Sequence, residues 1–305
     1  MAAKAAPVDA AASPLFFISL AFACNSFASA VRSPDGKLLA TGGYDGTIRL
    51  WDAESGKLVK ALIGHDSYVY GLSFSPDGAY LVSGGSFEVT ARIWEVKTGL
   101  LVKILKGHPS YVTTVSWSPD AKQIILAGGV SGDAAIYDPK TGKVLWSFKF
   151  KGYSIIPKPV VGNGMVYIST GYNAATVRAV KFGSKASEAW SIKKNAPHTP
   201  SMILSGNELF MVSDKAIMSC VDAKTGQVVW EERVKGTDHS SSPILADGKI
   251  YHTSEDGKGT IVEASRKFNV FSEFDLKEKT FASFAGVDGA LYVRTESQLY
   301  KFGKK

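Results

Sequence analysis

Four short segments of similar sequence recur at a nearly constant interval along the chain. They are Asp52–Gly56 (DAESG), Glu95–Gly99 (EVKTG), Asp138–Gly142 (DPKTG) and Asp222–Gly226 (DAKTG). Their glycines lie 43, 43 and 84 residues apart, and 84 is two intervals of 42. Each segment stands between two strand-like runs, which is typical of a turn within a sheet. A repeat of about 40–45 residues built from short strands indicates a β-propeller with one four-stranded blade per repeat.

The length of the chain limits the number of blades. With 305 residues and an interval near 42, seven blades fill it almost completely. We therefore predict an all-β protein, a single seven-bladed β-propeller of four-stranded antiparallel blades over residues 15–305, preceded by a disordered or targeting lead at 1–14. The first strands of the blades are predicted to begin near Ser26, Val69, Val112, Ile155, Ser201, Ser242 and Ala282.

The seventh blade is expected to need a strand from elsewhere in the chain. Only three strand-like runs are visible in it, at Phe284–Val287, Ala290–Arg294 and Gln298–Phe302. The apolar run Leu15–Ala23 belongs to no other blade. We predict that it pairs as the outermost strand of the seventh blade, because closing the ring removes two exposed sheet edges.

The N-terminal segment also has a second interpretation. Lys4, the apolar run Leu15–Ala23 and the small residues that follow it resemble a secretory signal peptide. Localisation is therefore left open: cytoplasmic if the N-terminus is retained, and periplasmic or secreted if residues 1–23 or 1–30 are removed. A retained closing strand is favoured, since cleavage after residue 30 would delete the first strand of blade one. The run is too short to span a bilayer as a helix, so no transmembrane segment is expected.

The third strands and the entry loops of the first three blades carry recurring motifs. Blade one has Trp51-Asp52 at the end of its third strand, and the next two blades open with Gly64-His65 and Gly107-His108. In these motifs, residues 15–150 resemble the WD-repeat family, which implies a structural set of His, Ser or Thr, Asp and Trp linked by hydrogen bonds within a blade. The residues that fit the set are Thr41, Asp45 and Trp51 in blade one, His65, Ser83 and Trp94 in blade two, and His108 in blade three, where Tyr137 replaces the Trp.

The second half of the chain carries a different pattern, D-x-x-T-G-x-x-x-W. Asp222 through Trp230 match it, as do Asp138 through Trp146. With this pattern, residues 151–305 resemble the pyrroloquinoline-quinone-like (quinoprotein-like) repeats of bacterial β-propellers. The resemblance implies that Trp146, Trp190 and Trp230 pack over neighbouring blades, where a large aromatic ring buries much apolar area. We therefore expect these three side chains to be largely buried.

Composition and motifs argue against catalysis and against nucleic-acid binding. The net charge of +7 is dispersed, with no dense basic run. A quinoprotein dehydrogenase would be longer, with eight blades, calcium ligands and a vicinal cysteine pair, but Cys24 and Cys220 are far apart. We expect no catalytic residue, no cofactor and no metal site, and a buried, unreactive thiol at Cys220. A degenerate quinoprotein-like dehydrogenase or quinone-binding protein remains the alternative.

The loops that enter the first strand of each blade are expected to converge around the central channel. They carry the candidate partner-binding residues Tyr68, Tyr111, Tyr153, His198 and His239. Aromatic and imidazole groups on one face suit a protein or peptide partner, so we predict a monomeric, non-catalytic interaction scaffold. The alternatives are that the tyrosines only pack against neighbouring blades, or that His198 and His239 form a metal site. That site would lack a third and a fourth ligand.

Overall fold

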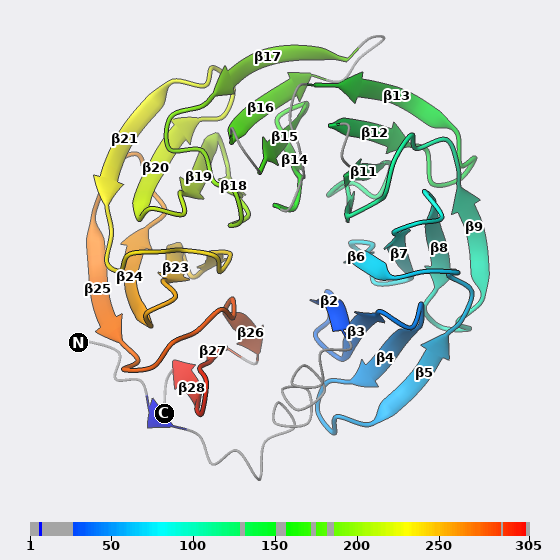
Figure 1. The fold of residues 1–305 in the computed structure, drawn as a ribbon, viewed down its shortest axis with the longest axis horizontal. Coiled ribbons are helices and arrows are strands. Elements are labelled where there is room, and N and C mark those ends of the chain that lie inside the picture. Colours follow the sequence, from blue (N-terminus) through cyan, green and yellow to red (C-terminus); the bar gives the residue numbers. More distant parts are fainter. Residues whose placement is uncertain are drawn as a thin grey trace.

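The computed structural model consists of seven antiparallel sheets arranged in a ring (Figure 1). It describes residues 6–7, 27–128, 132–150, 157–171, 175–181, 186–287 and 289–302. Each sheet has four strands, and the described residues contain no helix. Within these residues there is accordingly no apolar helix long enough to cross a membrane. The predicted all-β, seven-bladed propeller is confirmed.

The strands are numbered β1 to β28 in chain order, and consecutive strands form each blade. Blades one to three contain β2 (Phe27–Arg32), β3 (Leu38–Gly43), β4 (Ile48–Asp52), β5 (Leu58–Leu62); β6 (Val69–Phe74), β7 (Tyr80–Gly85), β8 (Ala91–Glu95), β9 (Leu101–Leu105); and β10 (Thr114–Trp117), β11 (Ile124–Gly128), β12 (Asp133–Tyr137), β13 (Val144–Lys149). Blades four and five contain β14 (Val160–Gly162), β15 (Met165–Thr170), β16 (Thr176–Lys181), β17 (Ser187–Ile192); and β18 (Ile203–Ser205), β19 (Glu208–Val212), β20 (Ile217–Asp222), β21 (Val228–Arg233). Blades six and seven contain β22 (Ile244–Ala246), β23 (Lys249–Thr253), β24 (Lys258–Glu263), β25 (Val270–Asp275); and β26 (Ala285–Val287), β27 (Ala290–Arg294), β28 (Leu299–Phe302), with β1 (Ala6–Pro7) as the fourth strand of blade seven.

The turn between the first two strands of blade one shows how local chemistry sets the repeat. The hydroxyl of Ser33 donates to Asp35 Oδ1 at 2.6 Å and accepts from the backbone N–H of Leu38 at 2.9 Å. Gly36 has φ +76°, a left-handed conformation that glycine adopts at low cost. The same serine contacts recur in the Ser75 and Ser118 turns. These turns fix where each hairpin reverses, and so they keep the blades in phase.

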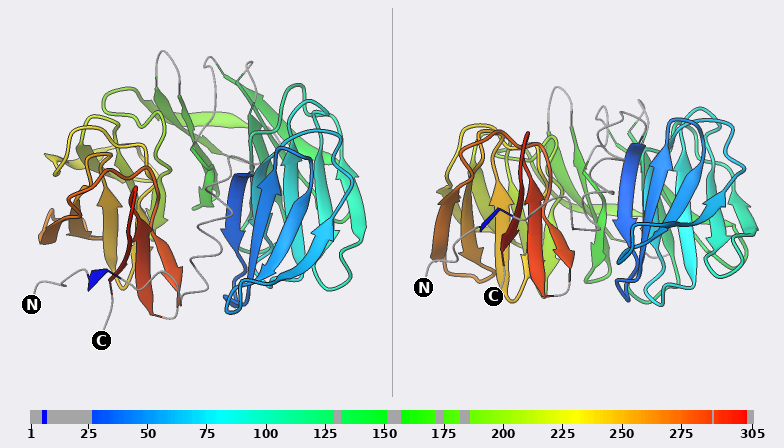
Figure 2. Two further views of the ribbon diagram at one scale, coloured as in Figure 1. Left: turned by 60° about the horizontal axis from the view of Figure 1, so that its bottom comes forward. Right: turned by 90° about the horizontal axis from the view of Figure 1, so that it is seen from below.

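The core lies between neighbouring sheets, because side chains alternate between the two faces of each strand. Met211 of blade five packs with Tyr167 of blade four in one buried cluster. Phe210, the preceding residue of the same strand, packs with Ile250 of blade six in another. Blade five is therefore buried on both faces, between blades four and six. The side views show the blades standing side by side around the ring (Figure 2). This burial of apolar area is the main source of stability.

Among the described residues, the start of the chain contacts blade seven in two places. The short strand β1 pairs antiparallel with β28, with Ala6 opposite Lys301 and Pro7 opposite Tyr300, at the rim of blade seven (Figure 1). At the inner side, Arg32 Nη1 of β2 donates to the carbonyl oxygen of Gly286 in β26 at 2.9 Å. The first and seventh blades are thus joined at their inner strands as well.

The segment that supplies the fourth strand differs from the predicted one. We predicted Leu15–Ala23, and these residues lie outside the described part of the chain. The position beside β28 is occupied by Ala6–Pro7, from within the predicted lead. An edge strand needs backbone pairing on one side only, which is why it accepts a proline that lacks an N–H. A search for apolar residues could not identify so short a strand.

Candidate functional site

The connections of each blade lie at opposite ends of the propeller. Because neighbouring strands are antiparallel, the turns after the first and third strands share one end, here called the turn face. The loops after the second and fourth strands share the other end, here called the loop face. The repeated D-x-x-T-G segments therefore lie on the turn face, and the loops chosen as partner-binding candidates belong to the loop face.

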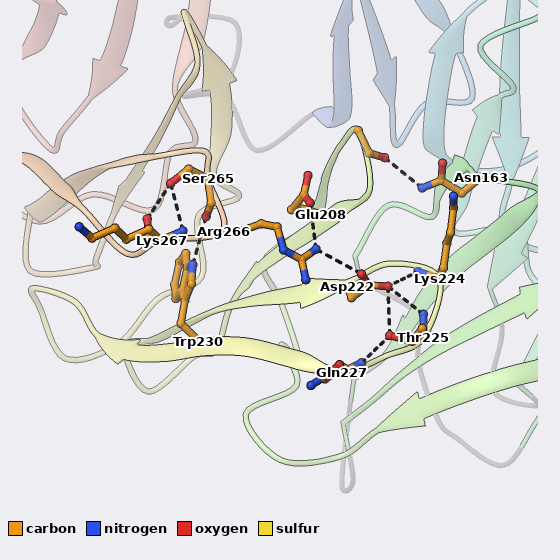
Figure 3. Close-up of polar contacts among 11 residues, drawn as sticks. Asn163, Glu208, Asp222, Lys224, Thr225, Gln227, Trp230, Ser265, Arg266 and Lys267 are labelled. Carbon is orange, nitrogen blue, oxygen red and sulfur yellow. Dashed lines mark hydrogen bonds and ion pairs between the residues drawn. The ribbon is translucent and has the colours of Figure 1, made fainter.

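On the turn face, two tryptophans bridge neighbouring blades. Trp190 Nε1 of blade four donates to the carbonyl oxygen of Ala223 in blade five at 3.0 Å. Trp230 Nε1 of blade five donates to that of Ser265 in blade six at 3.1 Å (Figure 3). Gly226 is needed beneath the first of these rings, since a Cβ there would lie 2.7 Å from the Trp190 ring. The turn glycine thus provides both a left-handed φ of +76° and room for the docked ring.

Two lysines occupy the equivalent position in the first blades. Lys60 and Lys103, like Trp146 and Trp230, stand four residues after a turn glycine. Lys60 Nζ donates to the carbonyl oxygen of Lys97 at 2.7 Å, and Lys103 Nζ to that of Lys140 at 2.6 Å. Each ammonium therefore makes the contact to the next blade that the indole N–H makes elsewhere. The sequence search missed these lysines because it looked for an aromatic residue at that position.

An arginine adds a polar link between blades five and six. Arg266 Nη1 contacts Glu208 Oε1 at 3.1 Å and Asp222 Oδ2 at 3.2 Å (Figure 3). The guanidinium is half exposed, so this ion pair contributes little to stability. Beside it, Asn163 Nδ2 donates to the carbonyl oxygen of Gly206 at 3.0 Å, which connects blades four and five (Figure 3). These polar contacts link the turns of neighbouring blades.

The three predicted docking tryptophans differ in burial. Trp146 is buried, whereas Trp190 and Trp230 are partly exposed. The expected burial is complete at Trp146, and the other two rings pack against buried clusters with part of their surface exposed. The other two rings lie over the turn of the next blade, where solvent reaches one side.

Replacing Trp230 by Ala should lower the free energy of unfolding by about 2 kcal/mol, because the ring is only partly buried. Trp230→Phe keeps most of the packing with Phe210 and Phe268 and loses the hydrogen bond to Ser265. It should therefore cost about 1 kcal/mol. Urea denaturation followed by circular dichroism measures both. An unchanged midpoint for Trp230→Ala would contradict the docking role.

In blade two, the set implied by the WD resemblance is linked by hydrogen bonds. Trp94 Nε1 donates to Ser83 Oγ at 2.8 Å, and Ser83 Oγ lies 2.6 Å from His65 Nε2. His65 Nδ1 contacts the carboxylate of Glu88, which also accepts from Arg92 Nη2 at 2.7 Å. Burial alone would raise the pKa of Glu88, but hydrogen bonds from His65 and Arg92 hold it below its usual value. Glu88 supplies the carboxylate for which no residue of blade two had been proposed.

Blades one and three contain only parts of this set. Trp51 Nε1 donates to Thr41 Oγ1 at 2.8 Å, but the Asp45 carboxylate binds Arg49 at 2.7 Å instead. In blade three, His108 Nδ1 donates to the carbonyl oxygen of Ser110 at 2.8 Å. Burial lowers the pKa of His108.

The tyrosine that replaces the third tryptophan is fully buried. Tyr137 has no hydrogen-bond partner for its hydroxyl among the described residues. Burial raises its pKa to about 12, so the phenol stays neutral. Of the first three blades, blade two alone holds the complete hydrogen-bonded set among the described residues.

On the loop face, Tyr68 and Tyr111 belong to a continuous row of aromatic rings. We define the aromatic patch as Tyr44, Tyr68, Tyr70, Phe87 and Tyr111. Phe87 lies between the two predicted tyrosines, with ring centroids 5.8 Å from Tyr68 and 5.1 Å from Tyr111. Tyr44 contacts Tyr68 at 5.1 Å in an edge-to-face arrangement. The patch therefore extends over blades one to three.

The aromatic patch is open to solvent. Phe87 is 62% exposed, and Tyr44, Tyr68 and Tyr111 are each more than one third exposed. Sequence analysis found Tyr68 and Tyr111 but missed Tyr44, Tyr70 and Phe87. Tyr44 and Phe87 lie in loops within a blade, between the second and third strands, rather than in loops between blades. A search of both loop types could have found them.

The other candidates for the partner-binding face do not join this patch. Tyr153 lies outside the described residues. His198 is exposed, and its backbone N–H donates to Asp214 Oδ2 at 2.7 Å in blade five. His239, expected to be exposed, is instead 1% exposed. Its ring turns inward and packs against His252, with centroids 5.2 Å apart, so we withdraw it from the partner-binding face.

The His239–His252 pair has unusual polar surroundings. Neither ring has a hydrogen bond at Nδ1 or Nε2 among the described residues. Burial lowers the pKa of His239. The carbonyl oxygens of Lys235 and Thr253 oppose this effect by favouring the charged form, but they do not meet the geometry of a hydrogen bond. Burial and the neighbouring His239 lower the pKa of His252 to about 3. Both imidazoles are therefore neutral near pH 7.

The described residues offer few groups for catalysis. They contain no group of three or more His, Cys, Asp or Glu side chains placed to hold a metal ion. Cys220 is a free, buried thiol whose pKa is raised by burial to about 12, so it is protonated at neutral pH. Cys24 lies outside the described residues.

Comparison with known proteins shows short matches to fungal relatives. The chain is 49% identical to nuclear distribution protein PAC1 of Mycosarcoma maydis over 59 residues, which is 19% of this chain and 13% of that protein. It is 53% identical to PAC1 of Gibberella zeae over 51 residues, 17% of this chain and 11% of the relative. The chain thus spans only about an eighth of the curated relatives it matches. Their fungal origin gives no support to a bacterial source.

Solved structures match nearly the whole chain at low identity. The structure of U3-55K has a TM-score of 0.72 at 15% identity and covers 92% of this chain and 95% of its own. The crystal structure of RRP9 WD40 repeats has a TM-score of 0.71 at 14% identity, covering 92% and 94%. At this identity the likeness concerns the propeller fold alone.

Two family models match different parts of the sequence, as the two resemblances implied. The WD domain, G-beta repeat model matches residues 23–52 and 56–95, in the first two blades. The PQQ-type model described as outer membrane protein assembly factor BamB matches residues 89–257. Because this second match covers more than half of the 305 residues, the chain belongs to the propeller family of that description, with WD repeats at its N-terminal side.

Proposed function

We propose that the protein is a non-catalytic scaffold that binds a protein or peptide partner on its loop face, at the aromatic patch. The observation that carries this proposal is the exposure of the patch, an unbroken row of rings over three blades. Tyrosine and phenylalanine offer large apolar contact area at small cost in side-chain entropy, and few such residues dominate the energy of an interface. The propeller fold shared with WD40 repeat structures agrees with this role.

The alternative of a quinone-binding protein lacks a comparable observation. In the described residues, no cluster of metal ligands accompanies the PQQ-type repeats. Residues of the pattern that defines these repeats, such as Gly226 and Trp230, are engaged in contacts between blades. Their role in the fold is therefore sufficient to account for the match to that family model. Absorbance and metal analysis of the purified protein would reveal a bound quinone or calcium and so overturn the scaffold proposal.

The test of the partner-binding face uses a phage-displayed library of random peptides selected against the purified protein. Peptides that bind the wild type should bind the triple variant Tyr68→Ala, Phe87→Ala, Tyr111→Ala at least about 30-fold more weakly, because hot-spot rings are lost. The melting temperature should change little, since these side chains are largely outside the core.

A matched triple variant serves as the control. Val59, Leu101 and Leu145 are also exposed apolar residues, but they lie on the outermost strands of the same three blades. Their replacement by Ala should leave peptide binding unchanged. If the patch variant folds and binds the selected peptides as the wild type does, the partner-binding face has been assigned wrongly.

A further inference from the structure

The aromatic patch is bordered by carboxylates. The loops that carry it cover residues 44–47, 63–68, 86–90 and 106–113, and they contain three carboxylates, Asp45, Asp66 and Glu88, against one basic residue, Lys106 at the start of the last loop. This composition contrasts with the whole chain, whose net charge is +7. Local acidity on a basic protein is a physical signal about partners, because complementary charge steers association and selects among ligands.

The arginines near the patch do not cancel this charge at the surface. Arg92 is 10% exposed and is held by Glu88 at 2.7 Å, whereas Asp66 is 85% exposed and only 3.5 Å from Arg92. Arg49, bound to Asp45, is also less exposed than its partner. The guanidinium groups are thus turned inward. The carboxylates of Asp66 and Asp45 face solvent, whereas that of Glu88 is as little exposed as Arg92.

The rings next to these carboxylates can receive a cation. Tyr44 precedes Asp45 directly, and Tyr68 follows Asp66 by two residues. The Tyr44–Tyr68 and Phe87–Tyr111 contacts are edge-to-face, which leaves ring surface of both pairs open to solvent. Arg and Lys side chains are attracted to such ring faces within about 6 Å of the centroid. A carboxylate beside an aromatic face strengthens that preference for a positive charge.

We infer that the aromatic patch recognises a basic peptide segment, with an Arg or Lys side chain over the Tyr68–Phe87 rings and its charge opposite Asp66. This inference rests on the proposed function, since it names the chemistry of the partner at the same face. Arginine suits the site best, because its flat guanidinium stacks on a ring while its N–H groups reach a carboxylate. An acidic segment would place like charges against Asp45 and Asp66.

The experiment uses the peptides selected from the random library whose binding is lost in the triple patch variant. These peptides should be enriched in Arg and Lys relative to the unselected library. Replacing the arginine of one such peptide by citrulline, a neutral residue of the same shape, should weaken binding about tenfold. Asp66→Asn in the protein should weaken binding of the arginine peptide by a similar factor and leave binding of the citrulline peptide unchanged. Binding of the arginine peptide should also weaken with added salt.

Glu54→Gln is the matched control, since Glu54 is an exposed carboxylate on the turn face of blade one. It should not change the affinity of either peptide. Patch-dependent peptides that are neutral or acidic, or a citrulline peptide that binds as well as its arginine parent, would overturn the basic-segment inference while leaving the proposed function intact. A library that yields no patch-dependent peptide would overturn both.

Discussion

Replacement of Trp94 by Ala should lower the free energy of unfolding by about 4 kcal/mol, the largest loss expected from a single substitution in this propeller. Trp94 is 1% exposed and packs in the cluster formed by blades one and two. Its removal would leave a cavity that the two sheets cannot fill. It would also remove the indole N–H that donates to Ser83 Oγ, the central atom of the network that includes His65.

Trp51 in blade one gives the matched comparison. It holds the equivalent position, but it is partly exposed and its N–H binds Thr41 in a blade that has no histidine. Trp51→Ala should therefore cost about 2 kcal/mol, roughly half as much. Urea denaturation followed by circular dichroism gives both values, and Trp94→Phe keeps the analysis possible if Trp94→Ala does not fold. Equal losses at the two positions would show that the blade-two network adds nothing to stability.

The sequence predicted the number and phase of the blades because the repeat rests on local chemistry. In the turn at residues 33–36, Ser33, Asp35 and Gly36 each have a defined role within five residues of chain. Such turns need no knowledge of distant contacts, so their spacing could be read directly. The phase that they set agrees with all seven sheets.

Contacts between blades were predictable only where their residue type was distinctive. Trp230 follows the D-x-x-T-G-x-x-x-W pattern and Trp190 is a tryptophan near the expected position, and both indole groups reach the next blade as expected. Lys60 and Lys103 make the same contact with an ordinary surface residue, which no composition rule separates from other lysines. Only the position four residues after the turn glycine identifies them, and that rule becomes visible once the geometry is known.

The loop face shows a similar limit. Tyr68 is exposed as predicted, but the direction of a loop side chain also depends on residues far along the chain. His239 turns inward and packs against His252, which lies in β23 of blade six, thirteen residues further along the chain. The identical spacing of His198 and His239 from the strands that follow them could not reveal this difference.

The second large effect is expected from His252→Met, which should stabilise the protein. In blade five Phe210 pairs with Ile203, and in blade six Tyr251 pairs with Ile244. Met211 and His252 are the next residues along these two strands, so they hold equivalent positions. The fold therefore accepts methionine there. Two buried nitrogens without partners among the described residues would be removed, which should add about 1 kcal/mol at pH 8.

The gain from His252→Met should grow as the pH falls. In the unfolded chain a histidine binds a proton near pH 6.5, whereas folded His252 does so only near pH 3. The unfolded state therefore binds more protons between these two pH values. As the pH falls from 7 to 5, His252 alone lowers the free energy of unfolding of the wild type by about 2 kcal/mol. His239, with Asp214 and Asp256 facing it, is kept in both proteins. Because His239 and His252 disfavour each other's charge, His239 should accept a proton more readily in the variant, which adds to the advantage at low pH. Denaturation at pH 8 and pH 5 should thus show that His252→Met raises the free energy of unfolding by about 1 and about 3 kcal/mol.

His198→Gln, at the exposed loop histidine, is the control and should show no gain at either pH. If the gain from His252→Met did not change with pH, His252 would already be charged or solvated in the folded protein.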